Sequence, residues 1–259
     1  MKRYRFHYQN IIRFDTSVVR QYFKLRCLPR EEPFQHVMQE NLYMFPGVSM
    51  RQDVDTFGNR IQYGHTLEPH GMFVYTSSGI VEQTPYRIPC EKVKPIYRLE
   101  SKFTAPSPEL LAFARAMTLD ASEDVRRIAI HLADAVYQHM TYMPGSTDNT
   151  TTAAQAFAKA EGVCQDYTHI FLALCKLRGI PSRYVDGFMT GIGYTHAWAE
   201  VYDGEAWIGI DPTNNNLITH GYIKIAHGRD AADCPVNRGI IIGNANQNAE
   251  IRVLTEEIK

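Results

Sequence analysis

The sequence has no long apolar run, no excess of charge of one sign and few cysteines. No uninterrupted stretch approaches the roughly 18 to 20 apolar residues that cross a bilayer, and residues 1–10 alternate basic and aromatic side chains without the apolar segment of a signal peptide. The 27 Lys and Arg against 28 Asp and Glu leave a formal net charge of -1. This balance gives no electrostatic reason to expect nucleic acid or an anionic membrane as a partner. We therefore expect a cytoplasmic protein that binds neither.

Cysteine usage argues against disulfides and structural metal. The 5 cysteines are scattered and contain no CxxC pair, unlike a disulfide scaffold or a zinc knuckle. The main metal alternative is a zinc site from Cys164, Cys175, His169 and His196. One predicted helix carries both cysteines, and their separation of 11 residues places the sulfurs about 16 Å apart. They cannot share an ion, so we expect no metal and no cofactor.

The first third of the chain has the pattern of an all-β domain. Tyr4, Phe6 and Tyr8 alternate with Arg5 and His7, and the following apolar runs are also short and separated by Gly- and Pro-containing turns. With 44% hydrophobic residues, the chain can bury a substantial core. The spacing of strands and turns predicts a β-sandwich over residues 1–83.

A change of composition and period marks a second domain. Five of the 13 prolines lie between Thr84 and Pro108, which predicts an extended connector over residues 84–107. Beyond it the period is helical and later becomes that of strands, so we expect a core over residues 108–259 with helices packed on an antiparallel sheet. Together the two parts predict the α+β class. The expected helices begin at Pro108, at Ser122 with Glu123 and Asp124, at the capping box Thr152–Gln155 and at Gln165; strands follow from Ser182.

The Asp203-Gly204 pair predicts a β-hairpin with a two-residue turn. Such a turn places Tyr202 opposite Glu205, and counting back along both strands places His196 directly opposite Asp211. Their β-carbons would then lie about 5 Å apart, within reach of an imidazole–carboxylate hydrogen bond. The other face is apolar throughout, which argues against a one-residue slip; it carries Ala197, Ala199, Val201, Ala206, Ile208 and Ile210.

Cys164 is expected at the N-terminus of the helix that follows Gly162-Val163. Unpaired backbone N–H groups and the positive end of the helix dipole favour a thiolate there. If this helix end abuts the hairpin, Cys164, His196 and Asp211 form a nucleophile, a base and the group that orients the base. The backbone N–H groups of Cys164 and Gln165 would also lie where a tetrahedral oxyanion develops.

Other polar residues in these segments suit ordinary structural roles at least as well. His169 falls about 140° around the helix from Cys164, which favours a core histidine over a second base. Asp166 and Asp186 suit capping or strand-end roles as well as support of the site. Trp198 shares a face with His196 and suits either packing or a wall of the acyl site. The remaining cysteines are expected to be small core residues: Cys27, Cys90, Cys175 and Cys234.

Four ordered motifs stand out in the second half: Gly162–Tyr167, Gly179–Val185, Thr195–Val201 and Asp211–Asn214. Together they closely resemble the bacterial transglutaminase-like proteins, a family described as cysteine proteases. The N-terminal strands resemble the β-sandwich domain that precedes the core in that family. The resemblance implies a papain-like fold for the core, with Cys164 as the nucleophile, His196 as the base and Asp211 as the third member.

The core is also distantly similar to the animal transglutaminases, which use calcium and an oxyanion-hole tryptophan. This chain has no EF-hand-like loop and no tryptophan before Cys164. Calcium dependence is therefore not implied. The second oxyanion donor stays open, with Gln155 and Trp198 as its two candidates.

The predicted reaction is attack of a Cys164 thiolate on a peptide or protein amide, giving a thioester acyl-enzyme. Water would make the protein a protease or amidase, which we favour, whereas an amine would make it a crosslinking transamidase. A module that keeps the core but lacks catalysis is the alternative from another class. The sequence does not define an oligomeric state.

Overall fold

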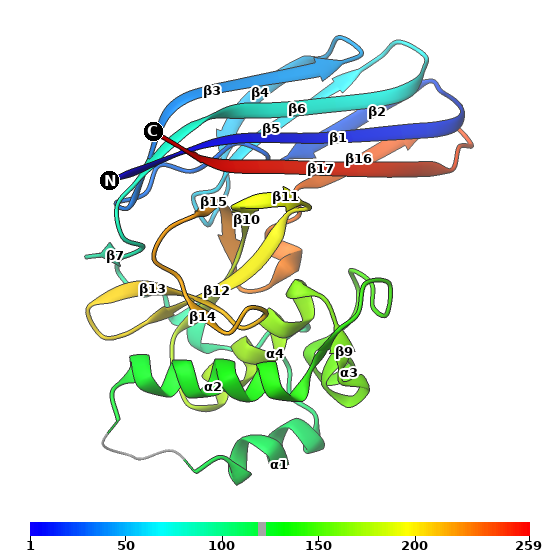
Figure 1. Ribbon diagram of the computed structural model, residues 1–259. Coiled ribbons are helices and arrows are strands. Elements are labelled where there is room, and N and C mark those ends of the chain that lie inside the picture. The colour runs from blue at the N-terminus through cyan, green and yellow to red at the C-terminus, as the bar shows by residue number, and fades with distance from the viewer. Residues whose placement is uncertain (119–122) are drawn as a thin grey trace.

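The computed structural model describes residues 1–118 and 123–259, with a β-sandwich packed on a part in which helices cover a sheet (Figure 1). The sandwich has two antiparallel sheets, in the orders β11-β17-β1-β6-β3 and β16-β2-β5-β4. The strands are β1 (Lys2–Val18), β2 (Arg20–Leu25), β3 (Gln35–Phe45), β4 (Ser49–Val54), β5 (Arg60–Thr66), β6 (His70–Gln83), β11 (Gly191–Gly193), β16 (Asn237–Ile242) and β17 (Gln247–Ile258).

Alternating burial along β1 builds the sandwich core and confirms the predicted all-β fold. Tyr4, Phe6 and Tyr8 are buried, whereas the residues between them are exposed. Inward side chains of the two sheets meet, and the rings of Phe23 in β2 and Phe73 in β6 lie 5.3 Å apart. Hydrophobic burial between the sheets therefore selects the face that the sequence pattern predicts.

The last two strands belong to the sandwich. β17 pairs antiparallel with β1, and β16 pairs with β2. The predicted range of 108–259 for the core is therefore too long at its C-terminal end. The periodicity of a strand indicates which face is buried but not which distant strand is its partner.

The other part contains four helices among the described residues, beside a sheet of order β14-β13-β12-β10-β15 with β7 added to β13. This arrangement confirms the α+β class. The elements are α1 (Pro108–Ala116), α2 (Val125–His139), α3 (Ala153–Lys159), α4 (Cys164–Leu177), β7 (Ile88–Pro89), β10 (Ser182–Met189), β12 (His196–Tyr202), β13 (Ala206–Asp211), β14 (Asn216–Leu217) and β15 (Tyr222–Gly228), with the short parallel pair β8 (Thr141–Tyr142) and β9 (Glu161–Gly162) and the 3-10 turns η1 (Pro95–Arg98) and η2 (Ala231–Asp233).

Polar caps define where the helices begin. Asp124 starts α2 by accepting a hydrogen bond from the Arg127 N–H at 2.8 Å. Ser122, predicted to share this role, lies outside the described residues. The predicted capping box is confirmed at α3, where the side chains of Thr152 and Gln155 each accept a hydrogen bond from the other's backbone N–H.

Helix α4 is central and its residues 166–176 are all buried. It packs against β10 and β12 on one side and against α2 and α3 on the other (Figure 1). Burial on all sides explains why its sequence is apolar around most of the helix. Its N-terminus lies toward the β12 end that carries His196.

The sheet is buried on both faces. Its α4 face carries the apolar set predicted for the hairpin, from Ala197 to Ile210, all of it buried. Its opposite face carries Trp198 and Trp207, which pack with Tyr86 and Tyr97 of the connector. The connector is thus a packed layer over the sheet rather than a free linker.

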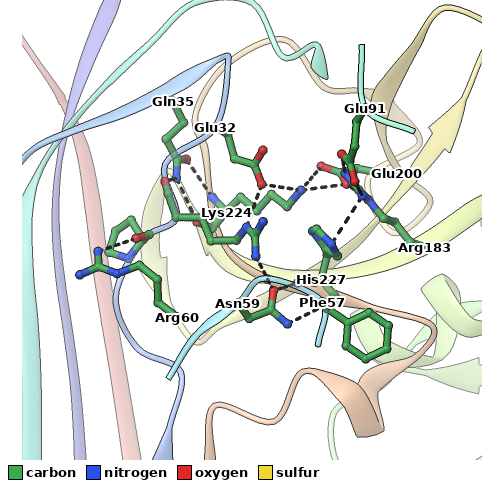
Figure 2. A network of polar contacts seen from close by, with 12 residues as sticks. Glu32, Gln35, Phe57, Asn59, Arg60, Glu91, Arg183, Glu200, Lys224 and His227 are labelled. Atoms are coloured by element: carbon green, nitrogen blue, oxygen red, sulfur yellow. Dashed lines mark hydrogen bonds and ion pairs between the residues drawn. The ribbon is translucent and has the colours of Figure 1, made fainter. Parts of the chain in front are cut away.

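A buried charged network joins this sheet to the loop between β2 and β3, and Figure 2 shows it from close by. Lys224 of β15 is fully buried and lies 2.8 Å from Glu200 and 3.0 Å from Glu32. Arg183 of β10 pairs with Glu200 and makes two hydrogen bonds of 2.6 and 2.9 Å to Glu91. Each buried charge has an opposite partner, which offsets the cost of its desolvation.

Candidate active site

Cys164 begins α4, and the residues around it explain the local geometry. The carboxylate of Asp166 accepts hydrogen bonds from the Val163 N–H at 2.8 Å and the Thr147 hydroxyl at 2.6 Å. Asp166 therefore caps the helix, one of the two roles weighed for it. A Cβ on Gly162 would lie 2.6 Å from this carboxylate, so the glycine of the motif allows the cap to pack closely.

The hairpin turn lies one residue later than predicted. Tyr202 is opposite Trp207, because the central turn residues are Gly204 and Glu205. The Asp203 carboxylate accepts hydrogen bonds from the backbone N–H groups of Glu205 at 2.9 Å and Ala206 at 2.8 Å. Gly204 takes a φ of +107°. The hydrogen bonds of the Asp203 side chain thus stabilise a turn centred on Gly204 and Glu205 rather than on Asp203 and Gly204.

The predicted direct opposition of His196 and Asp211 is therefore wrong, but their shared face is right. Moving the turn by one residue changes each partner by two positions, and side chains two positions apart point to the same side of a strand. The two residues lie diagonally, and Nε2 of His196 donates to Oδ2 of Asp211 at 2.7 Å.

Asp211 is fully buried and held by several donors. The same oxygen, Oδ2, accepts from the Asn214 amide at 2.7 Å and the Tyr222 hydroxyl at 2.8 Å. Oδ1 accepts from the backbone N–H of Thr213 at 2.9 Å. The carboxylate is thereby fixed in position and orients the imidazole.

The protonation states follow from these contacts. Burial alone lowers the pKa of His196, but the hydrogen bonds to Asp211 and to the Cys164 thiol raise it to about 10. Burial alone raises the pKa of Asp211, but His196 and the other donors keep it below its ordinary value. At neutral pH the pair is an imidazolium beside a carboxylate, with the sulfur of Cys164 against the ring.

Two hollows flank this group. One of about 540 Å³ is lined by His196 together with Tyr142, Tyr167, Met189 and Asn214 among others. Another of about 450 Å³ is lined by Gln165, next to Cys164, and by Tyr184, Asp186 and Arg238 among others. An extended substrate lying across the thiol would have room on both sides.

The remaining oxyanion candidates are engaged elsewhere. Trp198 is fully buried and its indole N–H donates to the Tyr86 hydroxyl at 3.0 Å, so it packs beneath His196. Gln155 is exposed and its side-chain oxygen belongs to the α3 cap. Gln165 lies beside Cys164, with its amide 3.4 Å from the Asp148 carbonyl.

Of the other residues predicted to lie in the core, all but Cys90 are buried. His169 is buried, accepts from the Ala231 N–H at 3.1 Å and has a pKa that burial lowers to about 3, as expected for a core histidine. Cys27, Cys175 and Cys234 are buried, and burial raises the pKa of each thiol. Cys90 is exposed, so its expected core position is wrong; it lies in the proline-rich connector, where periodicity indicates no face.

Sequence reasoning missed two donors to Asp211. Asn214 is in the fourth motif, and its position three residues after an aspartate is a recognisable turn signal. Tyr222 comes from β15, on another strand of the sheet, and no local pattern marks it.

Within residues 1–118 and 123–259, no group of three or more His, Cys, Asp or Glu is arranged to hold a metal ion. In the same residues, no helix is both long and apolar enough to cross a membrane.

Two protein families match the chain. Residues 111–212 match the transglutaminase-like superfamily, and residues 4–82 match the bacterial transglutaminase-like N-terminal region. An uncharacterized protein of Mycobacterium tuberculosis is 30% identical over 99% of this chain and 92% of its own length. An uncharacterized protein of Mycobacterium leprae is 24% identical over 93% of each chain. A solved structure named "putative cysteine protease", from Cytophaga hutchinsonii, matches with a TM-score of 0.80 at 25% identity, over 100% of this chain and 91% of that one.

Proposed function

Because this chain belongs to the bacterial transglutaminase-like family, we propose that it is a thiol-dependent acyl-transfer enzyme for peptide or glutamine-type amides. The observation that carries the proposal is the 2.7 Å hydrogen bond from His196 to the buried Asp211, with the Cys164 thiol against the same imidazole. In this proposal Cys164 is the nucleophile, His196 the base and Asp211 the group that orients the base.

In the proposed acylation, the thiol proton of Cys164 has already passed to Nδ1 of His196, since Nε2 is bonded to Asp211 and the ring is an imidazolium at neutral pH. The thiolate of Cys164 attacks the amide carbonyl carbon, and the carbonyl π electrons move to oxygen. When this intermediate collapses, the C–N bond breaks and His196 returns the proton to the departing nitrogen. The products are a free amine and a thioester on Cys164.

The first turn of α4 supplies donors for the developing oxyanion. The N–H groups of Cys164 and Gln165 belong to the helix end, where no preceding turn offers them a carbonyl. The helix dipole adds positive potential at the same place. We assign the oxyanion to these backbone groups, because the indole of Trp198 donates to Tyr86.

Water is the acceptor that we favour for the thioester. Cys164 is half-buried rather than enclosed, and Thr213 and Asn214 place polar groups in the hollow that His196 lines. These groups suit a water molecule from which His196 can take a proton. Attack by water gives a carboxylic acid and frees Cys164, whereas attack by an amine gives a transamidated product.

Alkylation with limiting iodoacetamide tests the site without a known substrate. We expect Cys164 to react ahead of the exposed Cys90, and to keep reacting well below the ordinary thiol pKa of about 8.5. Peptide mapping by mass spectrometry across pH gives both rates. The advantage of Cys164 should collapse in His196→Ala and persist in Cys175→Ala. Equal rates at Cys164 and Cys90 in the wild type favour a catalytically silent binding module instead.

Mass spectrometry of peptide amides then separates the two acceptors. The hydrolase proposal expects new carboxylic acids even when a primary amine is added in excess, whereas a transamidase gives the amine adduct. Undiminished turnover in Cys164→Ala ends the proposal in either form.

A further inference from the structure

Asp186 lies beside the proposed site but has no role in the triad. It pairs with Ala197 of β12, one position from His196, and shares the sheet face that α4 covers. Asp186 lines the hollow of about 450 Å³, to which Gln165 also contributes from the first turn of α4. The hollow therefore extends from the neighbour of Cys164 to this carboxylate.

The carboxylate of Asp186 has no counter-ion of its own. Within the described part of the chain, no Lys, Arg or His forms an ion pair with it, and the Gly187 N–H is the hydrogen-bond donor that it has. Burial raises the pKa of Asp186 to about 7, against the smaller lowering by Gly187 and His196. Glu200, which is fully buried whereas Asp186 is half-buried, shows the contrast: burial raises its pKa, but Arg183 and Lys224 bring it down to about 2.

A cation entering the hollow would supply the missing partner. A desolvated carboxylate gains more from an opposite charge than an exposed one does, because little water screens the pair. Tyr184 lines the same hollow, and besides burial both Asp186 and Cys164 contribute to its raised pKa. Since one phenol lies near both groups, a substrate held at Cys164 can extend a side chain to Asp186.

We propose that this hollow is a substrate subsite in which Asp186 binds the protonated amine of a lysine-like side chain next to the amide that Cys164 attacks. The inference rests on the proposed function. A protonated amine has no lone pair for attack, so this group is recognised and does not act as an acyl acceptor. Arg238 carries the opposite charge in the lining, and its exposed guanidinium is held by the Ala232 carbonyl at 2.9 Å.

Charged thiol reagents test the subsite directly. The two probes are 2-aminoethyl methanethiosulfonate, a cation, and ethyl methanethiosulfonate, its neutral analogue. The measured quantity is the ratio of their rates at Cys164, with the exposed Cys90 of the same molecule as reference. We expect the ratio at Cys164 at pH 8 to exceed that at Cys90 about tenfold, the order produced by one unpaired charge a few Å away.

Two variants that are expected to change the rate ratio in opposite directions distinguish recognition of the cation from a structural disturbance of the site. Asp186→Asn should bring the ratio at Cys164 down to that at Cys90, whereas Arg238→Gln should raise it. A purely structural effect would move both variants in the same direction. An unchanged ratio in Asp186→Asn, with Cys164 still reactive toward the neutral probe, overturns the subsite.

The wild type gives a second readout that needs no variant. The ratio should rise between pH 5.5 and 8.5 with an apparent midpoint near 7, as Asp186 loses its proton. The groups around Asp186 keep their charge over this interval: His196 has a pKa of about 10, and burial raises the pKa of Tyr8, Tyr184 and Cys234 above the ordinary values. The thiolate fraction affects both probes equally and cancels in the ratio.

The outcomes separate the two proposals. If Cys164 reacts with the neutral probe no faster than Cys90 does, the proposed function fails, while the charge ratio still reports on the hollow. If Cys164 is fast but the wild-type ratio is flat with pH and equal to that at Cys90, the subsite fails and the proposed function stands.

Discussion

Glu32 connects the sandwich side of the molecule to the other sheet, and its substitution tests how much this contact stabilises the fold. The network contains three carboxylates and three basic side chains, and Glu32 lies 3.0 Å from the fully buried Lys224 and 2.8 Å from Arg30. Glu32→Gln keeps the shape of the side chain but removes its charge. Lys224 then shares Glu200 with Arg183, and the buried group carries a net positive charge.

The expected cost follows from the geometry. Removing one partner of a buried ion pair destabilises a protein by about 3–5 kcal/mol. The lower figure, about 3 kcal/mol, applies here because Lys224 keeps its 2.8 Å contact with Glu200. For a chain of this size each kcal/mol lowers the melting temperature by roughly 2–4 °C, so we expect a fall of roughly 6–12 °C.

Circular dichroism or calorimetric melting measures this shift, and Arg5→Gln is the matched control. Arg5 lies 2.9 Å from Glu256, with 58% and 47% of the two side chains exposed, so its loss should cost at most about 1 kcal/mol. Adding Lys224→Met to Glu32→Gln should recover part of the loss, because the unpaired charge is then gone. Equal melting temperatures for Glu32→Gln and Arg5→Gln would refute the reasoning.

Three further predictions concern the candidate site. The pKa of His196 is raised from 6.5 to about 10, so the contribution of its charged form to stability is complete below pH 6.5 and is lost as the pH rises through about 10. The difference in unfolding free energy between the wild type and His196→Gln should therefore shrink over that interval. A difference that stays constant with pH contradicts this prediction. Asp211→Asn should slow iodoacetamide alkylation of Cys164 at pH 7 by more than about tenfold, since the imidazolium loses its carboxylate; an unchanged rate contradicts the assigned role. Gly187→Ala should lower the melting temperature by several degrees, because the added Cβ would lie 2.1 Å from a backbone oxygen of β15. Gly193→Ala, whose Cβ would have nothing within 4 Å, should leave the melting temperature unchanged. Similar melting temperatures for the two variants would show that the structure relieves the contact at Gly187.

Much of the fold could be predicted because its signals are local. The alternation of Tyr4, Phe6 and Tyr8 sets the buried face of β1, and the capping box of Thr152 and Gln155 sets the start of α3. Each depends on residues within a few positions of one another. Strand pairing carries no such signal, and so the predicted core range of 108–259 wrongly includes β16 and β17, which pair with strands of the sandwich.

The candidate site shows the same division at the level of single residues. The alternation of strand side chains places His196 and Asp211 on one face. That prediction holds although the turn lies one residue later than predicted, because each strand partner then changes by two positions and side chains two positions apart share a face. The position of the turn depends on the hydrogen bonds that the Asp203 side chain makes within it. The sequence pattern does not indicate which of the possible hydrogen bonds form. Trp198 was a candidate donor until Tyr86, 112 positions away, proved to accept its N–H.

By itself the sequence determined the α+β class, the helix that begins at Cys164 and the shared face of His196 and Asp211. Only the tertiary structure decided which strands complete the sandwich, which donors hold Asp211 and which hollow contains Asp186. The reason is physical: caps, turns and side-chain alternation are interactions between near neighbours. Burial and pairing depend instead on segments that meet only when the whole chain has folded.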